Sequence, residues 1–231
     1  MLKINNLSSG YGETMIIQNL DLEIKKGEVI ALIGKNGAGK TTLLKTIIGL
    51  IREKEGDIEF EGESLKKRKP EDRALSGIAY VPQGREIFPF LTVRENLVLG
   101  LESRGKKAKD IPVDIYELFP ELKTLNNRMG GDLSGGQQQQ LAIARMLITG
   151  PKLLLLDEPT EGIQPSIVFA IENAIRMIKT QKDISIILVE QFMEFALRLS
   201  DTCYLMEKGN LVFGEETANL NAEMIKSHLV L

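Results

Sequence analysis

The chain has 231 residues, of which 43% are hydrophobic and 26% charged, so it suits one globular domain with a sizeable core rather than a disordered segment. Its formal net charge of −3 argues against a nucleic-acid partner, because proteins that bind nucleic acids are commonly basic. No stretch approaches the roughly 20 apolar residues of a membrane span, and the start is too polar for a signal peptide. We therefore expect a soluble protein whose role at any membrane comes through partners. The single cysteine, Cys203, is expected to be a buried apolar residue in a reduced compartment.

The first third of the chain shows short strands separated by turns, and then a strand that leads into a helix. Val29 to Ile33 is a continuous apolar run, which is typical of a strand buried on both faces. The expected elements are strands near residues 4–7, 20–24, 29–33, 57–60 and 78–81, with a helix over 41–50.

The rest of the chain is mostly helical at first, from about residue 88 to 150, and then alternates strand and helix. The expected elements are strands at 153–156 and 184–189, helices at 166–179 and 194–199, and a hairpin of residues 204–206 and 211–213. This alternation predicts an α/β fold with a parallel sheet.

A glycine-rich loop between the buried strand and the first helix carries the strongest local signal. It fits the P-loop pattern G-x-x-x-x-G-K-[ST] in its usual strand-to-helix setting. Glycines allow turns in which successive N–H groups point at phosphate oxygens, and the helix N-terminus adds a favourable dipole. Lys40 is expected to reach the β- and γ-phosphates of ATP, and the Thr41 hydroxyl to hold Mg²⁺. The residues expected to bind nucleotide here are Gly34, Lys35, Asn36, Gly37, Ala38, Gly39, Lys40, Thr41 and Thr42.

Two adjacent acids, Asp157 and Glu158, end the buried strand Leu153–Leu156. A carboxylate at the carboxyl edge of a strand beside a P-loop is well placed to hold Mg²⁺, which we assign to Asp157. Glu158 is the expected general base that polarises the attacking water. The alternative, two solvated acids that cap a strand, is weakened by the neighbouring P-loop.

A second glycine-rich motif, Leu133 to Gln137, precedes a helix that runs to about Ile148. Ser134 and Gln137 have the spacing of a capping box, and the free N–H groups of such a helix end also attract anions. Helix capping and γ-phosphate binding are therefore compatible roles for Ser134, Gly135, Gly136 and Gln137.

Leu133–Gln137, with the P-loop about a hundred residues upstream and Leu153–Pro159 shortly downstream, resembles the nucleotide-binding domain of ABC transporters over nearly the whole chain. The resemblance implies a P-loop NTPase of ABC type over residues 1–231, with an antiparallel β subdomain and a helical subdomain at about 85–150. It also implies two domains arranged head to tail, so that Lys40 of one faces Ser134 of the other across one ATP.

The resemblance extends to two further site residues. Tyr11 matches the aromatic position that stacks on adenine, the alternative being an ordinary turn residue. Gln83 matches the glutamine that contacts Mg²⁺ or the attacking water, the alternative being a polar turn residue.

The segment from Arg85 to Asn96 corresponds to the family's surface for membrane subunits, so Phe88, Pro89, Phe90 and Leu91 are expected to be exposed. The alternative places these four in the core of the helical subdomain. The basic runs at residues 66–69 and 106–109 are expected to be solvated surface, with lipid headgroup contact as the alternative.

The chain departs from the family pattern at two positions. Gln191 stands where the family usually has a histidine, and the only histidine, His228, lies near the C-terminus. Glutamine can donate a hydrogen bond to the γ-phosphate, but it cannot carry a proton or a positive charge. Gln164 replaces an aspartate that would bridge to the opposite domain. These departures raise the alternative of a nucleotide-binding switch that does not hydrolyse ATP.

Both departures resemble the ATPases of branched-chain amino-acid-type importers, and the segments around Gln83 and Gln191 fit the second of their two ATPase subunits. Residues 132–141 and 158–167 are more similar to the urea importer version. The resemblance implies import of urea or a short-chain amide, with branched-chain amino acids as the alternative. It also implies a heterodimer with another ATPase or an ATP-bound self-dimer, two membrane permease subunits, a substrate-binding protein, and a place at the cytoplasmic face of the membrane. A soluble ABC protein of translation or DNA repair is disfavoured, because the chain has neither a tandem domain nor a coiled-coil insertion.

Overall fold

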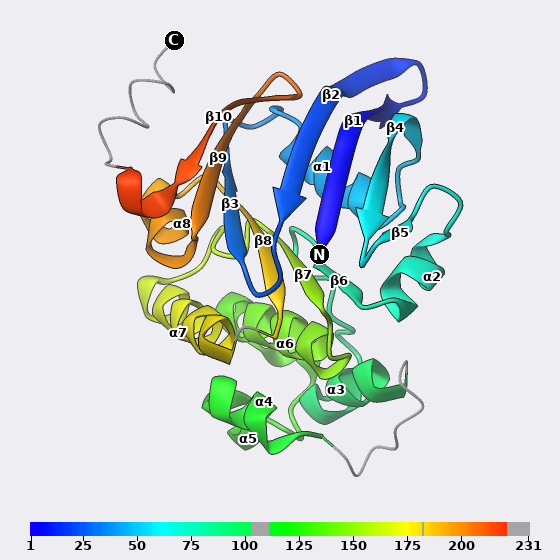
Figure 1. Cartoon of the computed structure of the whole chain (residues 1–231). Helices are drawn as coiled ribbons and strands as arrows, with labels where there is room; N and C mark the ends of the chain where they lie inside the picture. The colour runs from blue at the N-terminus through cyan, green and yellow to red at the C-terminus, as the bar shows by residue number, and fades with distance from the viewer. Residues whose placement is uncertain (103–110, 182, 221–231) are drawn as a thin grey trace.

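The computed structural model describes residues 1–102, 111–181 and 183–220, and within these ranges it contains two β-sheets and a group of helices (Figure 1). The smaller sheet has the order β2-β1-β4-β5 and pairs its strands antiparallel. Its strands are β1 (Leu2–Tyr11), β2 (Thr14–Ile24), β4 (Glu53–Phe60) and β5 (Glu63–Ser64).

The larger sheet has the order β10-β9-β3-β8-β7-β6, and every neighbouring pair is parallel except β9 with β10. Its strands are β3 (Val29–Ile33), β6 (Ile78–Val81), β7 (Leu153–Asp157), β8 (Ser185–Glu190), β9 (Thr202–Glu207) and β10 (Asn210–Glu216). The parallel order places the carboxyl ends of β3, β6, β7 and β8 at one edge, where ligands of such sheets usually bind.

The helices divide between the two faces of the larger sheet. α1 packs in the core between the two sheets, whereas α6 and α7 cover the opposite face and α3, α4 and α5 lie beyond them (Figure 1). The helices are α1 (Lys40–Ile47), α2 (Pro70–Leu75), α3 (Val93–Glu102), α4 (Val113–Leu118), α5 (Pro120–Thr124), α6 (Gly135–Ile148), α7 (Pro165–Gln181) and α8 (Met193–Leu199). None of the helices in the described ranges has the length and apolar character to cross a membrane.

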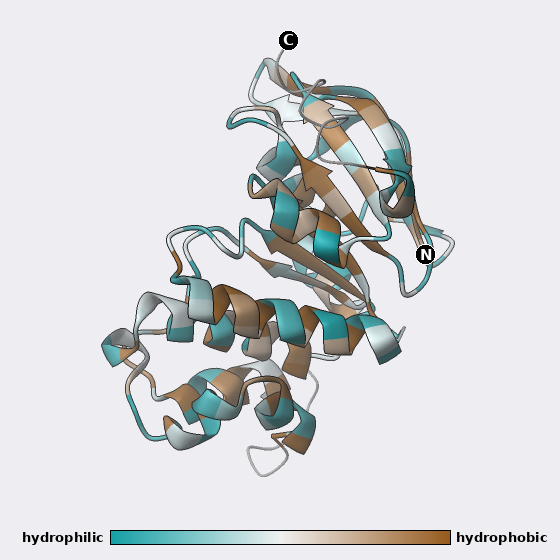
Figure 2. Ribbon diagram, turned by 90° about the vertical axis from the view of Figure 1, so that its left-hand side faces the viewer, coloured by the Kyte–Doolittle hydropathy of each residue, from teal (hydrophilic) through white to brown (hydrophobic). Residues whose placement is uncertain are grey.

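Strand β7 shows why a run of leucines forms the centre of the molecule. Successive side chains of a strand point to opposite faces, so Leu153 and Leu155 join the core that contains α1, whereas Leu154 and Leu156 join the core under α6 and α7. All four are fully buried, and the central strands are correspondingly hydrophobic along their length (Figure 2). Both cores therefore hold the strand in place up to Leu156, directly before Asp157 and Glu158.

The structure confirms the expected α/β class, the P-loop NTPase architecture and the burial of Cys203, whose pKa burial raises to about 12. Some elements differ from those expected from the sequence. β1 and β2 are long strands, α2 was not expected, and the segment that begins at Phe88 becomes helical only at Val93. In the first basic run, three side chains are exposed and the half-buried Arg68 contacts Glu63. The second run, with the polar connector, and His228 lie outside the described residues.

Candidate active site

The loop from Gly34 to Thr41 leaves the carboxyl end of β3 and turns directly into α1. Gly39 occupies the helix N-cap with a φ of 108°, and Gly37 has a φ of 80°, both in the left-handed region that favours glycine. A Cβ atom at Gly34 would collide with the backbone oxygen of Met206. The glycines therefore permit a loop that side chains would distort.

This loop lines a cavity of about 410 Å³ at the carboxyl edge of the larger sheet. Gln83 and Glu158, which follow β6 and β7, line it as well. The complete lining is Ile16, Asn36, Gly37, Ala38, Gly39, Lys40, Thr41, Thr42, Gln83 and Glu158. The structure thus brings seven of the nine loop residues predicted to bind nucleotide, Asn36 to Thr42, to one cavity.

Lys40 holds its ammonium group inside the loop. The side chain is 4% exposed, and Nζ donates hydrogen bonds to the backbone oxygens of Gly34 at 2.7 Å and Lys35 at 3.2 Å. Nζ also lies 3.6 Å from Oε1 of Glu158. A positive charge is therefore fixed between the phosphate loop and the proposed base.

The Asp157 carboxylate is buried between two hydroxyl groups. Thr41 Oγ1 donates to Oδ1 at 3.0 Å, and the Tyr80 hydroxyl donates to Oδ2 at 2.9 Å. Burial raises the pKa of Asp157, although both hydrogen bonds act to lower it. Burial and the neighbouring Asp157 also raise the pKa of Tyr80, so its hydroxyl keeps its proton.

Thr41 and Asp157 supply the kind of oxygen ligands that suit Mg²⁺. Among the described residues, no group of three or more histidine, cysteine or acidic side chains could enclose a metal ion. Mg²⁺ is commonly bound by one or two protein oxygens together with phosphate oxygens and water, so a hydroxyl and a carboxylate 3.0 Å apart beside a phosphate loop fit it.

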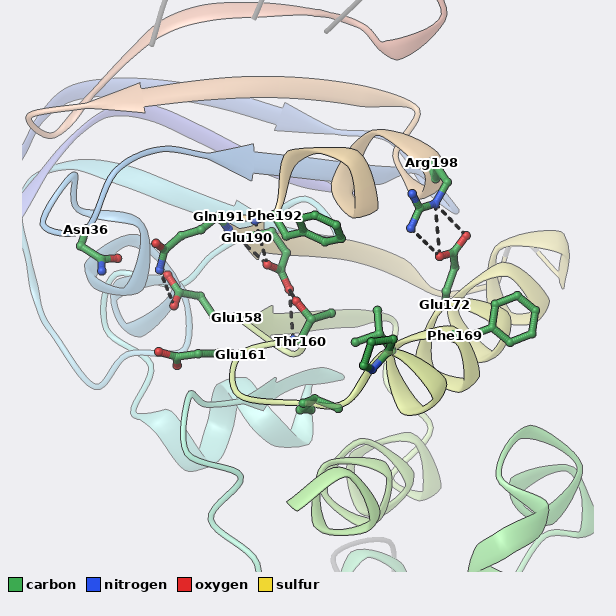
Figure 3. Close-up of a pocket in the computed structure, with 13 residues that line it drawn as sticks. Asn36, Glu158, Thr160, Glu161, Phe169, Glu172, Glu190, Gln191, Phe192 and Arg198 are labelled. Atoms are coloured by element: carbon green, nitrogen blue, oxygen red, sulfur yellow. Dashed lines mark hydrogen bonds and ion pairs between the residues drawn. The ribbon is translucent and has the colours of Figure 1, made fainter. Parts of the chain in front are cut away.

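The side chains of Glu158 and Gln191 meet beside the phosphate-loop cavity, which Glu158 lines, in the neighbouring cavity that both residues line (Figure 3). Gln191 Nε2 donates to Glu158 Oε2 at 2.9 Å, and the Glu158 backbone N–H donates to the Val189 oxygen at 2.9 Å. Glu158 is 8% exposed and has a φ of 48°, an uncommon conformation for a residue other than glycine. Such strain persists where the surroundings fix it, and here it aims a carboxylate at the phosphate loop.

A second cavity of about 620 Å³ adjoins Glu158 and extends along α7 and α8 (Figure 3). Glu161 lines it, and the exposed Gln83 donates from Nε2 to Glu161 Oε2 at 2.6 Å. Two exposed aromatics, Phe169 and Phe192, stand on its walls. Gln83 therefore links the loop after β6 to the loop after β7.

The motif from Ser134 to Gln137 forms the predicted capping box at the start of α6. Gln137 N–H donates to Ser134 Oγ at 3.3 Å, and Ser134 N–H donates to Gln137 Oε1 at 3.0 Å. None of its residues lines the cavity at the phosphate loop. A Cβ atom at Gly135 would lie 2.7 Å from the Arg85 guanidinium, so this glycine lets the loop after Gln83 approach the motif.

The surface that follows Gln83 is exposed, as predicted, and the alternative that it forms internal core is wrong for three of its four residues. Phe88 is 49% exposed and Phe90 is 90% exposed, Pro89 is exposed, and Leu91 is half-buried. Phe88 and Leu75 line a groove of about 650 Å³ over β6, α3 and α6.

Tyr11 is 52% exposed at the turn between β1 and β2 and does not line the cavity at the phosphate loop, whereas the neighbouring Ile16 does. Sequence reasoning missed Ile16, Tyr80, Glu161 and Glu190. Their positions depend on strand order and on contacts between loops, which no local pattern of the sequence shows.

The sequence of this chain is similar to those of known proteins over most of its length. The sequence model of the family described as ABC transporter matches residues 17–161. The high-affinity branched-chain amino acid transport ATP-binding protein BraG of Pseudomonas aeruginosa is 41% identical over 95% of this chain and 94% of its own. The probable branched-chain amino acid transport ATP-binding protein LivF of Archaeoglobus fulgidus is 38% identical over 95% of this chain and 93% of its own.

A solved structure adds a dimer to the comparison. A dimeric ATP-binding cassette in a post-hydrolysis state, bound to ADP and phosphate, superposes with a TM-score of 0.85 at 25% identity. The match covers 95% of this chain and 100% of that chain. The similarity in fold thus extends over nearly the whole of this chain.

Proposed function

Because this chain belongs to the ABC transporter family, whose ATP-binding subunits couple ATP hydrolysis to transport, we propose that it powers the import of urea or a short-chain amide. The observation that carries hydrolysis is the 2.9 Å hydrogen bond from Gln191 to Glu158 at the edge of the phosphate-loop cavity. This contact supports the proposal, because hydrolysis needs a carboxylate base for the attacking water and a hydrogen-bond donor near the γ-phosphate.

The site residues predicted from the sequence each have a proposed part in this reaction. Lys40 and the backbone N–H groups of its loop bind the phosphates, and Glu158 takes the proton of the attacking water. Gln191 orients Glu158 and donates toward the γ-phosphate, and Gln83 orients the water from the other side. Tyr11 stacks on the adenine from the exposed turn.

Thr41 and Asp157 are the proposed ligands of Mg²⁺, with Gln83 as a third contact. When bound, the ion offsets negative charge on the β- and γ-phosphates. Tyr80 holds the carboxylate of Asp157 in place through its hydroxyl group.

We further propose that a second nucleotide-binding domain completes the site. Ser134 to Gln137 lie outside the cavity of their own chain, although their capped helix end suits an anion. A head-to-tail partner would bring its own copy of this motif to the ATP bound at Lys40. The preferred partner is a second, different ATPase subunit, with an ATP-bound self-dimer as the alternative.

The membrane partners of the proposed complex are two permease subunits fed by a substrate-binding protein at the opposite side of the membrane. The exposed Phe88 and Phe90 and the adjacent groove support a docking surface for the permeases. The chain itself would lie at the cytoplasmic face.

Two different resemblances bear on the identity of the transported solute. Residues 132–141 and 158–167 resemble the urea importer ATPase, whereas BraG and LivF are named for branched-chain amino acids. We keep urea or a short-chain amide as the first solute to test and branched-chain amino acids as the second.

Hydrolysis is tested by measuring ATP turnover of the purified chain over a range of protein concentrations, with Glu158→Gln as the control. If two copies form a working pair, specific activity rises with concentration because the dimer is the active species. Glu158→Gln should lower turnover by at least about a hundredfold while ATP binding persists, because only the base is lost.

One result would favour the second candidate, a switch that binds ATP without hydrolysing it. Gln191 and Gln164 motivate this candidate. Gln191 replaces a histidine that can carry a proton, and Gln164 replaces an aspartate that would bridge to the opposite domain. Saturable ATP binding with no turnover, even beside the second ATPase subunit, would support the switch and overturn the proposed hydrolysis. Normal turnover of Glu158→Gln would instead refute the assignment of Glu158 as the base.

A further inference from the structure

Glu190 is a buried acid that the proposed reaction does not use. It is the last residue of β8, directly before Gln191, and it is 2% exposed. Its Oε1 accepts hydrogen bonds from the Thr160 N–H at 3.1 Å and the Thr160 hydroxyl at 2.8 Å. Its Oε2 accepts from the N–H groups of Gln191 at 3.2 Å and Phe192 at 3.4 Å.

These contacts join two loops that are far apart in the sequence but adjacent at the edge of the sheet. Thr160 belongs to the loop that begins with Glu158, whereas Gln191 and Phe192 begin the loop after β8 (Figure 3). The same two loops carry Glu158 and Gln191, whose side chains form a hydrogen bond of 2.9 Å. One carboxylate thus fixes the backbone behind both halves of the proposed catalytic pair.

We propose that Glu190 is a positioning residue for ATP hydrolysis, which holds Glu158 and Gln191 together by tying the Thr160 loop to the Gln191 loop. The inference rests on the proposed function. Glu190 itself does not line the phosphate-loop cavity, so it acts through the two residues that it positions.

The hydrogen-bond donors around Glu190 indicate which substitution tests its role. Three of the four contacts come from backbone N–H groups, which can only donate, so the site requires an acceptor on both oxygens. Burial raises the pKa of Glu190, and the hydrogen bonds from Thr160, Phe192 and Gln191 act against that rise. Glutamine has the same shape, but its NH₂ group would face N–H donors at one loop or the other.

The test compares ATP turnover of the full-length wild type with that of Glu190→Gln, under conditions in which the wild type is active. We expect kcat to fall by about tenfold to a hundredfold, because displacement of catalytic groups by about 1 Å has effects of this size. KM and ATP affinity should change by less than about threefold, since the loop from Gly34 to Thr42 keeps its contacts. The control Glu23→Gln makes the same substitution on the exposed face of β2 and should leave kcat unchanged.

A double-mutant cycle separates positioning from a general loss of structure. If Glu190 acts by holding Glu158 and Gln191 together, the loss caused by Glu190→Gln should be smaller in a Gln191→Ala background than in the wild type, because that pair is then already broken. Independent, multiplicative losses would overturn the inference, and so would an unchanged kcat. If Glu190→Gln does not fold, Thr160→Val removes only the hydroxyl contact, and the same lower kcat at constant KM is then required of it.

The outcomes for the wild type keep this inference distinct from the proposed function. A wild type without turnover, alone or with a second ATPase subunit, overturns the proposed function and this inference with it. An active wild type whose kcat does not respond to Glu190→Gln or Thr160→Val overturns the inference alone.

Discussion

Tyr80 contributes a hydroxyl group to the carboxylate on which the proposed Mg²⁺ site depends. Its hydroxyl and that of Thr41 engage one oxygen each of Asp157, so both oxygens of this buried group are oriented. Loss of a group that orients a metal ligand in this way typically lowers metal affinity by about tenfold to a hundredfold. Tyr80 should therefore influence Mg²⁺ binding without touching the nucleotide phosphates.

Tyr80→Phe should raise the Mg²⁺ concentration needed for half-maximal ATP turnover by about tenfold or more, because Asp157 loses one of its two orienting hydrogen bonds. Turnover at saturating Mg²⁺ should stay near that of the wild type. A Mg²⁺ titration of ATPase activity measures both quantities. Tyr204→Phe, which removes a hydroxyl from a strand on the far side of β3, is the matched control. An unchanged half-saturating Mg²⁺ concentration in Tyr80→Phe would contradict the role given to its hydroxyl.

The residues that carry known motifs could be predicted from the sequence, but the residues that support them could not. Lys40, Thr41 and Glu158 were identified because their spacing from glycines and from a buried strand carries the chemistry. Tyr80 and Glu190 act only because β6, β7 and β8 lie side by side, and strand order is not written in any local pattern. Glu161 likewise meets Gln83 across 78 positions of sequence.

At the scale of elements, contacts between residues far apart in the sequence set the lengths of strands that local sequence patterns did not predict. β1 and β2 extend well beyond the alternating segments that predicted them, because each strand hydrogen-bonds to its neighbour along most of its length. The short helix α2 begins at a proline and has only one buried residue, Arg73, so it shows no apolar periodicity that would predict it. Arg73 instead donates to the oxygens of Thr46 and Ile47 at the end of α1.

Helix α6 shows an element whose start has two proposed roles, capping and phosphate binding. Ser134 closes the capping box with Gln137, and the same helix end is proposed to face ATP bound to a partner domain. The two roles can be separated, because an aspartate caps a helix well but repels a phosphate.

Ser134→Ala should lower the free energy of unfolding by about 1 kcal/mol and also reduce ATP turnover, because both roles lose the hydroxyl. Ser134→Asp should keep most of the stability yet lose turnover at least as severely. Chemical denaturation and ATPase assays on the two variants measure the two effects separately. If Ser134→Asp keeps normal turnover, the motif does not bind phosphate and its role is capping alone.

At the scale of the whole molecule, the fold separates the proposed ATP site from the surface proposed to meet the permease subunits. The phosphate-loop cavity lies at the carboxyl edge of the larger sheet, while the exposed phenylalanines and the groove beside them lie over β6, α3 and α6. We propose that residues of about 85–150, which include α3 to α6, form the helical subdomain that carries this surface. The segment from Gln83 to Phe88 runs between the two sites and contains three successive residues of positive φ, Gly84, Arg85 and Glu86.

Arg145 marks the buried end of the proposed docking groove. It is 8% exposed, its guanidinium lies 5.0 Å from the centre of the Phe88 ring, and Nη2 donates to the Glu86 oxygen at 2.6 Å. This contact joins the floor of the groove to the segment after Gln83. A partner seated on Phe88 would therefore press on the same segment that leads back to the ATP site.

Since the ATP site and the docking surface are both proposed to serve partners common to the family, the transported solute has to be identified in the intact transporter. Cells in which the gene for this chain is deleted should lose high-affinity uptake of radiolabelled urea, and the wild-type gene should restore it. Glu158→Gln, which keeps the fold and the docking surface, should not restore uptake because it cannot drive the cycle. Loss of leucine uptake with normal urea uptake would instead assign the branched-chain amino acids that the names of BraG and LivF favour.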